Sequence, residues 1–364
     1  MISQTVYMPK RVGFISSPTP LYRLSGVSAD FGCDIFVKRD DLAGIGFGGN
    51  KLRKLDYLIA DALKKGCSAI VTNGSLQTNH GMLTALCATK AGLRCLLFLL
   101  IEDAGKKTLS GNLLLDDYIG CDIELVDVSD IMASKRSVEE KDLLCEARLR
   151  LRKEEVLPHY LNKYETQRDA LYEIPSAGST PTGIMGYFSC MREISDQTES
   201  PFDYIFCGNG SGGTYAGLWL GSKFLQTGSR IIGVNIEEMN PKKPAFIANL
   251  INSAAENLGL SVKAQPEDFC FLTNSVNLGY GIPDDDTMSV IEYIARKEGF
   301  FLDPVYSAKV FNGALKFIRQ NRLPRNSRIL LLHSGGLPGI FNANMIEYRN
   351  QRSGILDRWN HAAD

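Results

Sequence analysis

A lysine at a glycine-rich turn is the first candidate for chemistry in this chain. Lys51 follows three glycines, at positions 46, 48 and 49, and begins a segment with leucines at helical spacing. Glycines allow backbone conformations with positive φ and let a ligand approach the main chain closely. An amine held there beside a bound carbonyl compound can form a Schiff base. A single lysine at a helix start is more commonly a solvated surface residue. A role in chemistry therefore requires other residues of the chain that could bind a ligand beside it.

A glycine-rich loop further along the chain could hold an anion. It consists of Gly210, Ser211, Gly212, Gly213 and Thr214. The loop follows a β-rich segment and precedes a helix-like one, so backbone N–H groups and the helix dipole could converge on a phosphate. It lacks the Gly-Lys-Ser/Thr ending of a nucleotide P-loop, which favours the phosphate of another cofactor. Glu237 and Glu238 lie near the position of a ribose-binding carboxylate, so a dinucleotide site stays open, as does a purely structural turn.

Short polar side chains gather in a third segment, residues 73–80, which follows a strand-like run. The candidates for hydrogen bonds to a carboxylate or a ring hydroxyl are Ser75, Thr78, Asn79 and His80. Helix capping by Thr78 or Asn79 would account for one such residue. Because six of the eight residues are polar and able to hydrogen-bond, we interpret the segment as a binding loop. His80 alone would be interpreted as a structural histidine.

Three more hydroxyl groups stand beside turns in the C-terminal third of the chain. Tyr280 lies between two glycines, Tyr306 ends an Asp-Pro-Val-Tyr segment, and Ser334 precedes two glycines. A tyrosine in a half-buried wall is the ordinary interpretation of either tyrosine.

The elements that must position these residues alternate between strand-like and helix-like patterns. Strands are expected at 34–40, 68–73, 94–101, 122–128, 170–174, 204–208, 230–236, 269–273 and 328–333. Helices are expected after Lys51 and at 76–91, 108–119, 131–168, 245–257, 285–298 and 307–319, with one more ending at Glu193. This alternation predicts an α/β fold with doubly wound, mostly parallel sheets. Such sheets bind ligands at the carboxyl ends of their strands, where the glycine loops fall.

The composition argues against several classes of protein. Lys and Arg number 40 against 41 Asp and Glu, so the net charge of −1 gives no nucleic-acid footprint. The longest apolar run, 95–101, is too short to cross a membrane, and the first residues lack a signal-peptide pattern. Nine cysteines without CxxC pairs predict reduced thiols in a cytoplasmic protein, and the four histidines suggest no metal site.

Taken together and in order, the motifs resemble a known family of pyridoxal-phosphate enzymes. They are Gly48-Gly-Asn-Lys-Leu-Arg-Lys54, Gln77-Thr-Asn-His80, Gly210-Ser-Gly-Gly-Thr214, Asp303-Pro-Val-Tyr306 and His333-Ser-Gly-Gly336. The family is that of D-cysteine desulfhydrase and 1-aminocyclopropane-1-carboxylate (ACC) deaminase, and the likeness runs from about residue 10 to 343. Each motif is weak alone, whereas the ordered set is specific.

The resemblance implies the two-domain fold of tryptophan synthase β, known as fold type II. Residues 1–52 and 166–364 would form the large cofactor-binding domain and residues 53–165 a smaller inserted domain. Lys51 matches the lysine that bonds the cofactor, pyridoxal 5'-phosphate. Asn79 matches the partner of its ring hydroxyl, and Ser334 the hydroxyl facing its pyridine nitrogen. The remaining matches are the phosphate loop from Gly210 to Thr214, Thr78 at the substrate carboxylate, and the active-site tyrosines Tyr280 and Tyr306; Ser75 and His80 join the expected substrate contacts.

Departures from the family pattern bear on the substrate. ACC deaminases have a glutamate after the second tyrosine, where this chain has Ser307, and Asn-Gln where it has Asn79-His80. Both differences favour the desulfhydrases, although these usually have an arginine where Met82 stands. We therefore predict a cytoplasmic pyridoxal-phosphate lyase that removes a β-substituent from a small amino acid and releases pyruvate and ammonia. ACC ring opening is the alternative, and β-replacement or racemisation is also open.

Two hypotheses come from other classes of protein. The chain could bind pyridoxal phosphate or an amino acid without turnover, or it could be a nicotinamide-dependent oxidoreductase. The resemblance also suggests a homodimer, although no interface can be identified in the sequence. Finally, the glycines before Lys51 lie where the large domain leads into the small one, so we consider them a possible hinge.

Overall fold

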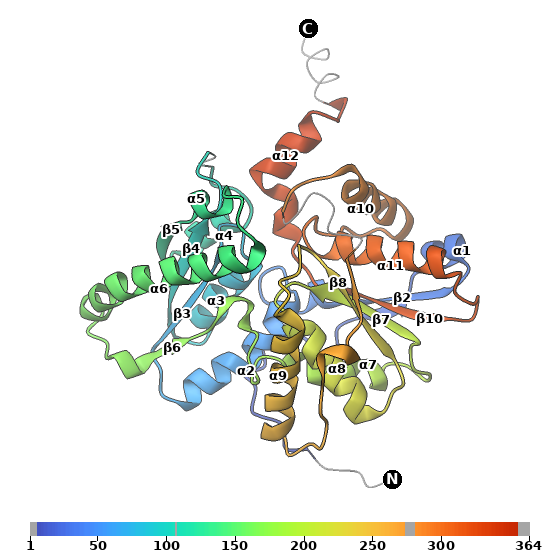
Figure 1. Cartoon of the computed structure of the whole chain (residues 1–364), viewed down its shortest axis with the longest axis horizontal. Coiled ribbons are helices and arrows are strands. Elements are labelled where there is room, and N and C mark those ends of the chain that lie inside the picture. The colour runs from blue at the N-terminus through green and yellow to red at the C-terminus, as the bar shows by residue number, and fades with distance from the viewer. Residues whose placement is uncertain (1–5, 106–107, 274–280, 356–364) are drawn as a thin grey trace.

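The computed structural model describes residues 6–105, 108–273 and 281–355, and these residues form two β-sheets (Figure 1). The larger sheet has the order β1-β2-β10-β7-β8-β9 and the smaller has β5-β4-β3-β6. Every neighbouring pair is parallel except β1 with β2. Helices cover the faces of both sheets, so the predicted α/β class with mostly parallel sheets is confirmed.

The bounds of the elements follow the predicted alternation. The strands are β1 Leu21–Arg23, β2 Asp34–Arg39, β3 Ala69–Ser75, β4 Arg94–Ile101, β5 Asp122–Asp127, β6 Leu171–Glu173, β7 Tyr204–Asn209, β8 Arg230–Asn235, β9 Phe271–Leu272 and β10 Arg328–His333. The α-helices are α1 Ser25–Phe31, α2 Asn50–Lys64, α3 Asn79–Lys90, α4 Gly111–Ile119, α5 Ser129–Met132, α6 Val138–Lys163, α7 Met185–Asp196, α8 Gly213–Leu225, α9 Lys243–Asn257, α10 Asp285–Glu298, α11 Ser307–Asn321 and α12 Ala343–Asn350.

Both sheets are buried on both faces, which explains the unbroken apolar runs in the sequence. Ile205 belongs to a cluster on one face of the larger sheet, and Phe206, the next residue, belongs to a cluster on the other face. Leu97 and Phe98 divide in the same way between the two faces of the smaller sheet. Since successive strand residues point to opposite faces, a strand covered on both sides needs apolar residues at every position.

The smaller sheet reaches past residue 165. Strand β6 pairs with β3 in this sheet, with Ile70 opposite Tyr172. The inserted domain at 53–165 stays a proposal. Because β6 pairs with β3, a domain built on the smaller sheet would extend beyond residue 165 to include β6.

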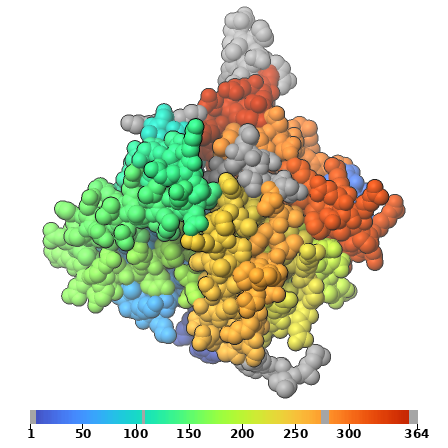
Figure 2. Space-filling model, in the orientation of Figure 1, coloured from blue at the N-terminus to red at the C-terminus, as the bar shows by residue number. Residues whose placement is uncertain are grey.

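The charge-rich segment 131–168 contains the long helix α6. Ser137 and Glu140 form a capping box at its start, and Leu149 and Leu157 pack on the smaller sheet. Its first turns also contact the segment before α9, since Asn240 Nδ2 donates to Asp142 Oδ2 over 2.8 Å. In Figure 2 the green surface of α6 meets the yellow and orange surface around α9.

Helix starts were the least accurate part of the prediction. Helix α3 begins at Asn79 rather than 76, because the Thr78 hydroxyl accepts a hydrogen bond from the Gly81 N–H and caps the helix there. Helix α4 begins at Gly111 rather than 108.

Three further observations concern the described part of the chain. None of its helices is long and apolar enough to cross a membrane. Its cysteines are unpaired, and no group of three or more His, Cys, Asp or Glu side chains there is arranged to hold a metal ion.

Candidate functional site

The turn before Lys51 is wedged between two other loops. The Gly49 φ of +111° is unfavourable for other residues, and a Cβ there would lie 2.9 Å from the Ser334 carbonyl oxygen. A Cβ on Gly48 would lie 2.3 Å from the Asp41 carbonyl oxygen. The Asn50 N–H donates to the same Ser334 oxygen over 2.9 Å. The glycines therefore bring the start of α2 against the loop that follows β10.

Lys51 itself is buried in the first turn of α2. Its side chain is 9% exposed, and burial lowers the pKa of its amine to about 8. An amine with this pKa is neutral in a substantial fraction of molecules near pH 8, and a neutral amine can act as a nucleophile or a base.

A second buried lysine, Lys54, was missed by the sequence analysis. Its Nζ donates to the Ala177 carbonyl oxygen over 3.0 Å and to Ser179 Oγ over 3.1 Å. Ser179 Oγ in turn donates to Ser211 Oγ of the glycine loop over 2.8 Å. Burial, and then the charge of Lys51, lower the pKa of Lys54. The spacing of three residues, which places both lysines on one helix face, was the available signal.

The glycine loop after β7 closes around this second lysine. A Cβ on Gly213 would lie 2.6 Å from Lys54 Nζ and 2.5 Å from Ser179 Oγ, so only glycine fits without a shift. Asn50 Nδ2 donates to Thr214 Oγ1 over 3.0 Å, which ties the loop to the turn of Lys51. Gly212 has φ +81°, and α8 begins directly after it. A cation, hydroxyl groups and a helix N-terminus together suit a phosphate.

Gly210, the first residue of this loop, faces the end of β8. A Cβ at that position would lie 2.9 Å from Ile236 Cδ1.

The loop after β3 presents its polar groups in different directions. Thr78 is buried as the cap of α3, and its N–H donates to the Ser75 carbonyl oxygen over 3.0 Å. Asn79 is half-buried, and its Oδ1 accepts a hydrogen bond of 2.8 Å from Asn112 Nδ2 on α4. Asn112 was also missed, since nothing around it in the sequence marks it.

His80 points into the smaller sheet. Its Nε2 is 3.0 Å from Thr72 Oγ1, and that hydroxyl donates its hydrogen to the Ile174 carbonyl oxygen over 2.8 Å. His80 Nε2 must therefore be the donor to Thr72, which makes Nδ1 the unprotonated nitrogen. Burial, followed by the charges of Lys51 and Lys54, lowers the pKa of His80, so the ring is neutral at pH 7.

The loop after β10 is held by buried polar groups. Ser334 is buried, and the preceding His333 donates from Nε2 to the Phe301 carbonyl oxygen over 2.8 Å. Asp303 accepts hydrogen bonds from the Tyr306 N–H and from the hydroxyl of Ser307, which is fully buried. The predicted tyrosine at position 280 lies outside the described residues.

Helix α2 is fixed on its other side by a buried ionic network. Arg53 Nη2 lies 2.8 Å from Asp40 Oδ1 and 3.0 Å from Glu193 Oε1, and Lys38 also pairs with Glu193. Burial raises the pKa of Asp40, but the charge and hydrogen bonds of Arg53 outweigh that effect and lower it overall. The network thus holds the helix that positions Lys51.

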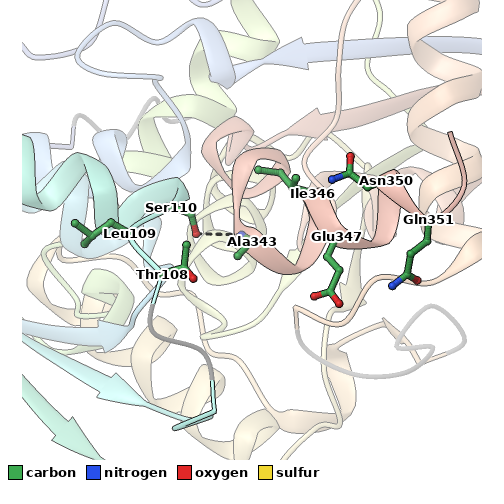
Figure 3. Close-up of a pocket in the computed structure, with 8 residues that line it drawn as sticks. All are labelled: Thr108, Leu109, Ser110, Ala343, Ile346, Glu347, Asn350 and Gln351. Carbon is green, nitrogen blue, oxygen red and sulfur yellow. Dashed lines mark hydrogen bonds between the residues drawn. The ribbon is translucent and has the colours of Figure 1, made fainter. Parts of the chain in front are cut away.

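One cleft of the molecule lies away from these residues. A cavity of about 570 Å³ opens between α12 and residues 108–110, and Figure 3 shows its lining. Lys51 and the glycine loop are not among the lining residues.

The chain is similar to several known proteins over most of its length. A family model described as pyridoxal-phosphate dependent enzyme matches residues 14–335. A relative from Pyrococcus horikoshii named "Putative 1-aminocyclopropane-1-carboxylate deaminase" is 36% identical over 91% of this chain and 93% of its own. A relative of the same name from Thermotoga maritima is also 36% identical, over 91% of this chain and 97% of its own.

Solved structures of similar proteins share the fold of this chain. The crystal structure of an ACC deaminase homologue has a TM-score of 0.78 and 34% identity, covering 94% of this chain and 95% of its own. Threonine deaminase isoform 2 from Solanum lycopersicum has a TM-score of 0.60 at 15% identity, covering 96% of this chain and 97% of its own. This more distant likeness concerns the fold alone.

Proposed function

The chain belongs to the family of pyridoxal-phosphate dependent enzymes, and we propose that it is a lyase that eliminates a β-substituent from a small amino acid. With cysteine as substrate, the products would be pyruvate, ammonia and hydrogen sulfide, one water being consumed. The observation that carries the proposal is the buried amine of Lys51, whose turn is hydrogen-bonded through Asn50 to both Ser334 and Thr214.

The residues around Lys51 fit pyridoxal phosphate. The phosphate would lie on the loop from Gly210 to Thr214, beside the Lys54 amine, where a Cβ on Gly213 would intrude. Lys51 would bond the cofactor's aldehyde carbon, with Asn79 at the ring hydroxyl and Ser334 at the pyridine nitrogen.

The bound cofactor withdraws electrons from the substrate's Cα, and the protein decides which bond breaks. Lys51 Nζ, released when substrate binds, would take the Cα proton, a role that its lowered pKa suits. Thr78 and the N-terminal end of α3 would bind the substrate carboxylate, with Ser75 and His80 in the same loop. Tyr306 and Tyr280 would contact the substrate's side chain.

The position of Ser307 supports elimination over ring opening. Its hydroxyl is fully buried and bonds Asp303, so the position carries no acid or base that could reach a substrate. A glutamate in this place would add a carboxylate beside the buried Asp303, at a high desolvation cost.

ACC deamination is the second candidate, and the names of the similar proteins favour it. The two activities give different keto acids, pyruvate from cysteine and 2-oxobutanoate from ACC. β-Replacement would give an amino acid instead, and racemisation would give only the enantiomer.

One substrate panel tests these alternatives. Purified protein loaded with pyridoxal phosphate would be incubated with D-cysteine, L-cysteine, cysteate and ACC, and the keto acid identified by mass. We expect pyruvate from at least one β-substituted alanine. Bound cofactor without turnover of any member would contradict the proposal and favour a binding protein. The visible absorbance of the cofactor should also disappear in Lys51→Ala, and its persistence would exclude Lys51 as the bonding residue.

Assembly and location complete the proposal. We propose a homodimer, because Phe341 and Ile346 expose apolar side chains around α12, which projects from the body in Figure 1. Light scattering that gives the mass of one chain would refute it. The unpaired cysteines suit a reducing compartment such as the cytoplasm.

A further inference from the structure

We propose that Asn112 is a positioning residue that fixes the orientation of the Asn79 side-chain amide. Asn112 is fully buried in the first turn of α4, and Asn79 is the first residue of α3. The inference rests on the proposed function in one respect, the placement of Asn79 at the ring hydroxyl of the cofactor. It identifies what keeps the Nδ2 donor of Asn79, rather than its Oδ1 acceptor, available to that hydroxyl.

The side-chain amide of Gln77 can be oriented without ambiguity. Its Nε2 donates to the Ser110 carbonyl oxygen over 3.0 Å, and its Oε1 accepts from the Asn112 N–H over 3.0 Å. Both partners are backbone groups, and a backbone carbonyl can only accept while an N–H can only donate. A flipped Gln77 amide would lose both hydrogen bonds.

The side-chain amide of Asn112 is also oriented by a backbone partner. Its Nδ2 donates to the Gln77 carbonyl oxygen over 2.9 Å, so the nitrogen end of this amide is fixed by a backbone acceptor. The same Nδ2 donates to Asn79 Oδ1 over 2.8 Å. Asn79 must therefore direct its carbonyl oxygen toward Asn112, which leaves its two N–H groups for another acceptor. A phenolic oxygen on the cofactor ring is such an acceptor.

The position of Asn112 is unusual because half of its amide is unsatisfied. Within the described part of the chain its buried Oδ1 has no hydrogen-bond partner. A buried acceptor without a partner costs free energy, so the contribution of Asn112 lies on its donor side.

The segment that carries Asn112 is held from two sides, by a hydrogen bond to α12 and by close packing against Gln77. Figure 3 shows the Ala343 N–H, at the start of α12, donating to Ser110 Oγ, a bond of 3.0 Å. Gly111 has φ +55°, and a Cβ there would lie 2.3 Å from Gln77 Oε1. Asn112 is thus held between α12 and the loop that contains Asn79.

Replacing Asn112 by aspartate gives a specific perturbation. The side chain keeps its size but loses its donor, and the new carboxylate oxygen would face Asn79 Oδ1 and a backbone carbonyl. The Asn79 amide would then turn to donate to residue 112 and present its oxygen to the ring hydroxyl. The ionised hydroxyl would lose a donor and gain a repulsive neighbour, which raises its pKa.

The experiment compares Asn112→Asp, Asn112→Ala, Asn79→Ala and the double variant Asn79→Ala/Asn112→Ala. Asp117→Asn, an exposed position on the same helix, serves as the control. Three quantities are measured: the affinity of cofactor-free protein for pyridoxal phosphate, the pH midpoint of the visible absorbance after loading, and the thermal midpoint without cofactor.

We expect Asn112→Ala to weaken cofactor affinity about three- to tenfold, as one hydrogen bond would. Asn112→Asp should weaken it by about tenfold or more and shift the absorbance midpoint upward. The double variant should bind no more weakly than Asn79→Ala alone, because Asn112 acts through Asn79. Asp117→Asn should match the original protein.

Three results would overturn the proposal. The first is a double variant in which the full effect of Asn112→Ala multiplies that of Asn79→Ala. The second is a wild-type absorbance midpoint and affinity in Asn112→Asp, provided that its thermal midpoint shows a folded protein. The third is an unchanged cofactor affinity in Asn79→Ala, which would remove the role of Asn79 while leaving the substrate panel and the Lys51→Ala test of the proposed function intact.

Discussion

Replacing Lys51 by methionine should stabilise the cofactor-free protein at neutral pH. Methionine fills a similar volume without a charge, and Lys51 is 9% exposed with a pKa lowered by burial from 10.5 to about 8. An unfolded chain gives lysine its ordinary pKa, so between pH 8 and 10.5 the unfolded state binds more protons than the folded state. The contribution of Lys51 to the free energy of unfolding therefore rises with pH across this interval.

The size of the effect follows from the same pKa. One pKa unit corresponds to about 1.4 kcal/mol, so a pKa lowered from 10.5 to about 8 costs the folded state at most about 3.5 kcal/mol below pH 8. The charge of Lys51 also lowers the pKa of Lys54, because the two ammonium groups repel each other. Removing the Lys51 charge ends this repulsion and stabilises the folded protein further.

Urea unfolding of cofactor-free protein at pH 7 and pH 10 measures this difference. Lys51→Met should exceed the original protein by about 1–3 kcal/mol at pH 7, and the gap should shrink toward pH 10. Any gain from the apolar methionine itself is the same at both pH values, so the change with pH is the diagnostic quantity. Lys64→Met, an exposed position on the same helix, should show no such change.

A gap of equal size at both pH values would refute the reasoning. It would mean that the Lys51 ammonium group is as stable in the folded protein as in the unfolded chain, so that folding does not lower its pKa. Lys51 would then stay almost fully protonated even near pH 8, and its assignment as the base at Cα would lose its physical support.

Three further substitutions test other parts of the structure. Gly213→Ala should weaken pyridoxal-phosphate binding by at least about tenfold, measured by titration of cofactor-free protein, since its Cβ would lie 2.6 Å from Lys54 Nζ. Asp40→Asn should lower the free energy of unfolding in urea by about 3–5 kcal/mol, because it leaves two buried cations, Lys38 and Arg53, with the single carboxylate of Glu193. Ser137→Ala should lower it by about 1 kcal/mol through loss of the α6 cap, measured by the same urea unfolding.

Periodicity in the sequence was enough to predict the elements that form the cores of the sheets. Strands β4 and β10 and helix α10 have the predicted bounds, because each is an apolar or amphipathic run between clear breakers. Helix starts were less accurate because capping depends on one hydroxyl, as at Thr78, and several nearby residues could have supplied it.

The candidate site was predictable where glycines and polar residues cluster along the chain, and not where partners come from distant segments. Lys54 bonds Ser179, 125 residues later, and Asn112 bonds Asn79, 33 residues earlier. Neither partner is marked by local spacing, since each contact joins segments that are far apart in the chain and meet only in the folded protein. His80 shows the converse, because it lies within a binding motif and yet bonds Thr72 in the sheet.

The glycines before Lys51 were predicted as a hinge, and the structure supplies another reason for two of them. Gly48 and Gly49 lie where a Cβ would meet the backbone of Asp41 and Ser334, so close packing alone requires glycine there. A Gly49→Ala variant would displace Ser334 directly and could not separate hinge motion from distortion of the site. Gly46 differs, because a Cβ there would meet only the flexible side-chain ends of Leu86, Leu83 and Met82, and its φ of +59° costs alanine about 1–2 kcal/mol. Gly46→Ala therefore tests the hinge: slower turnover with unchanged cofactor affinity would support it, and unchanged turnover would remove it.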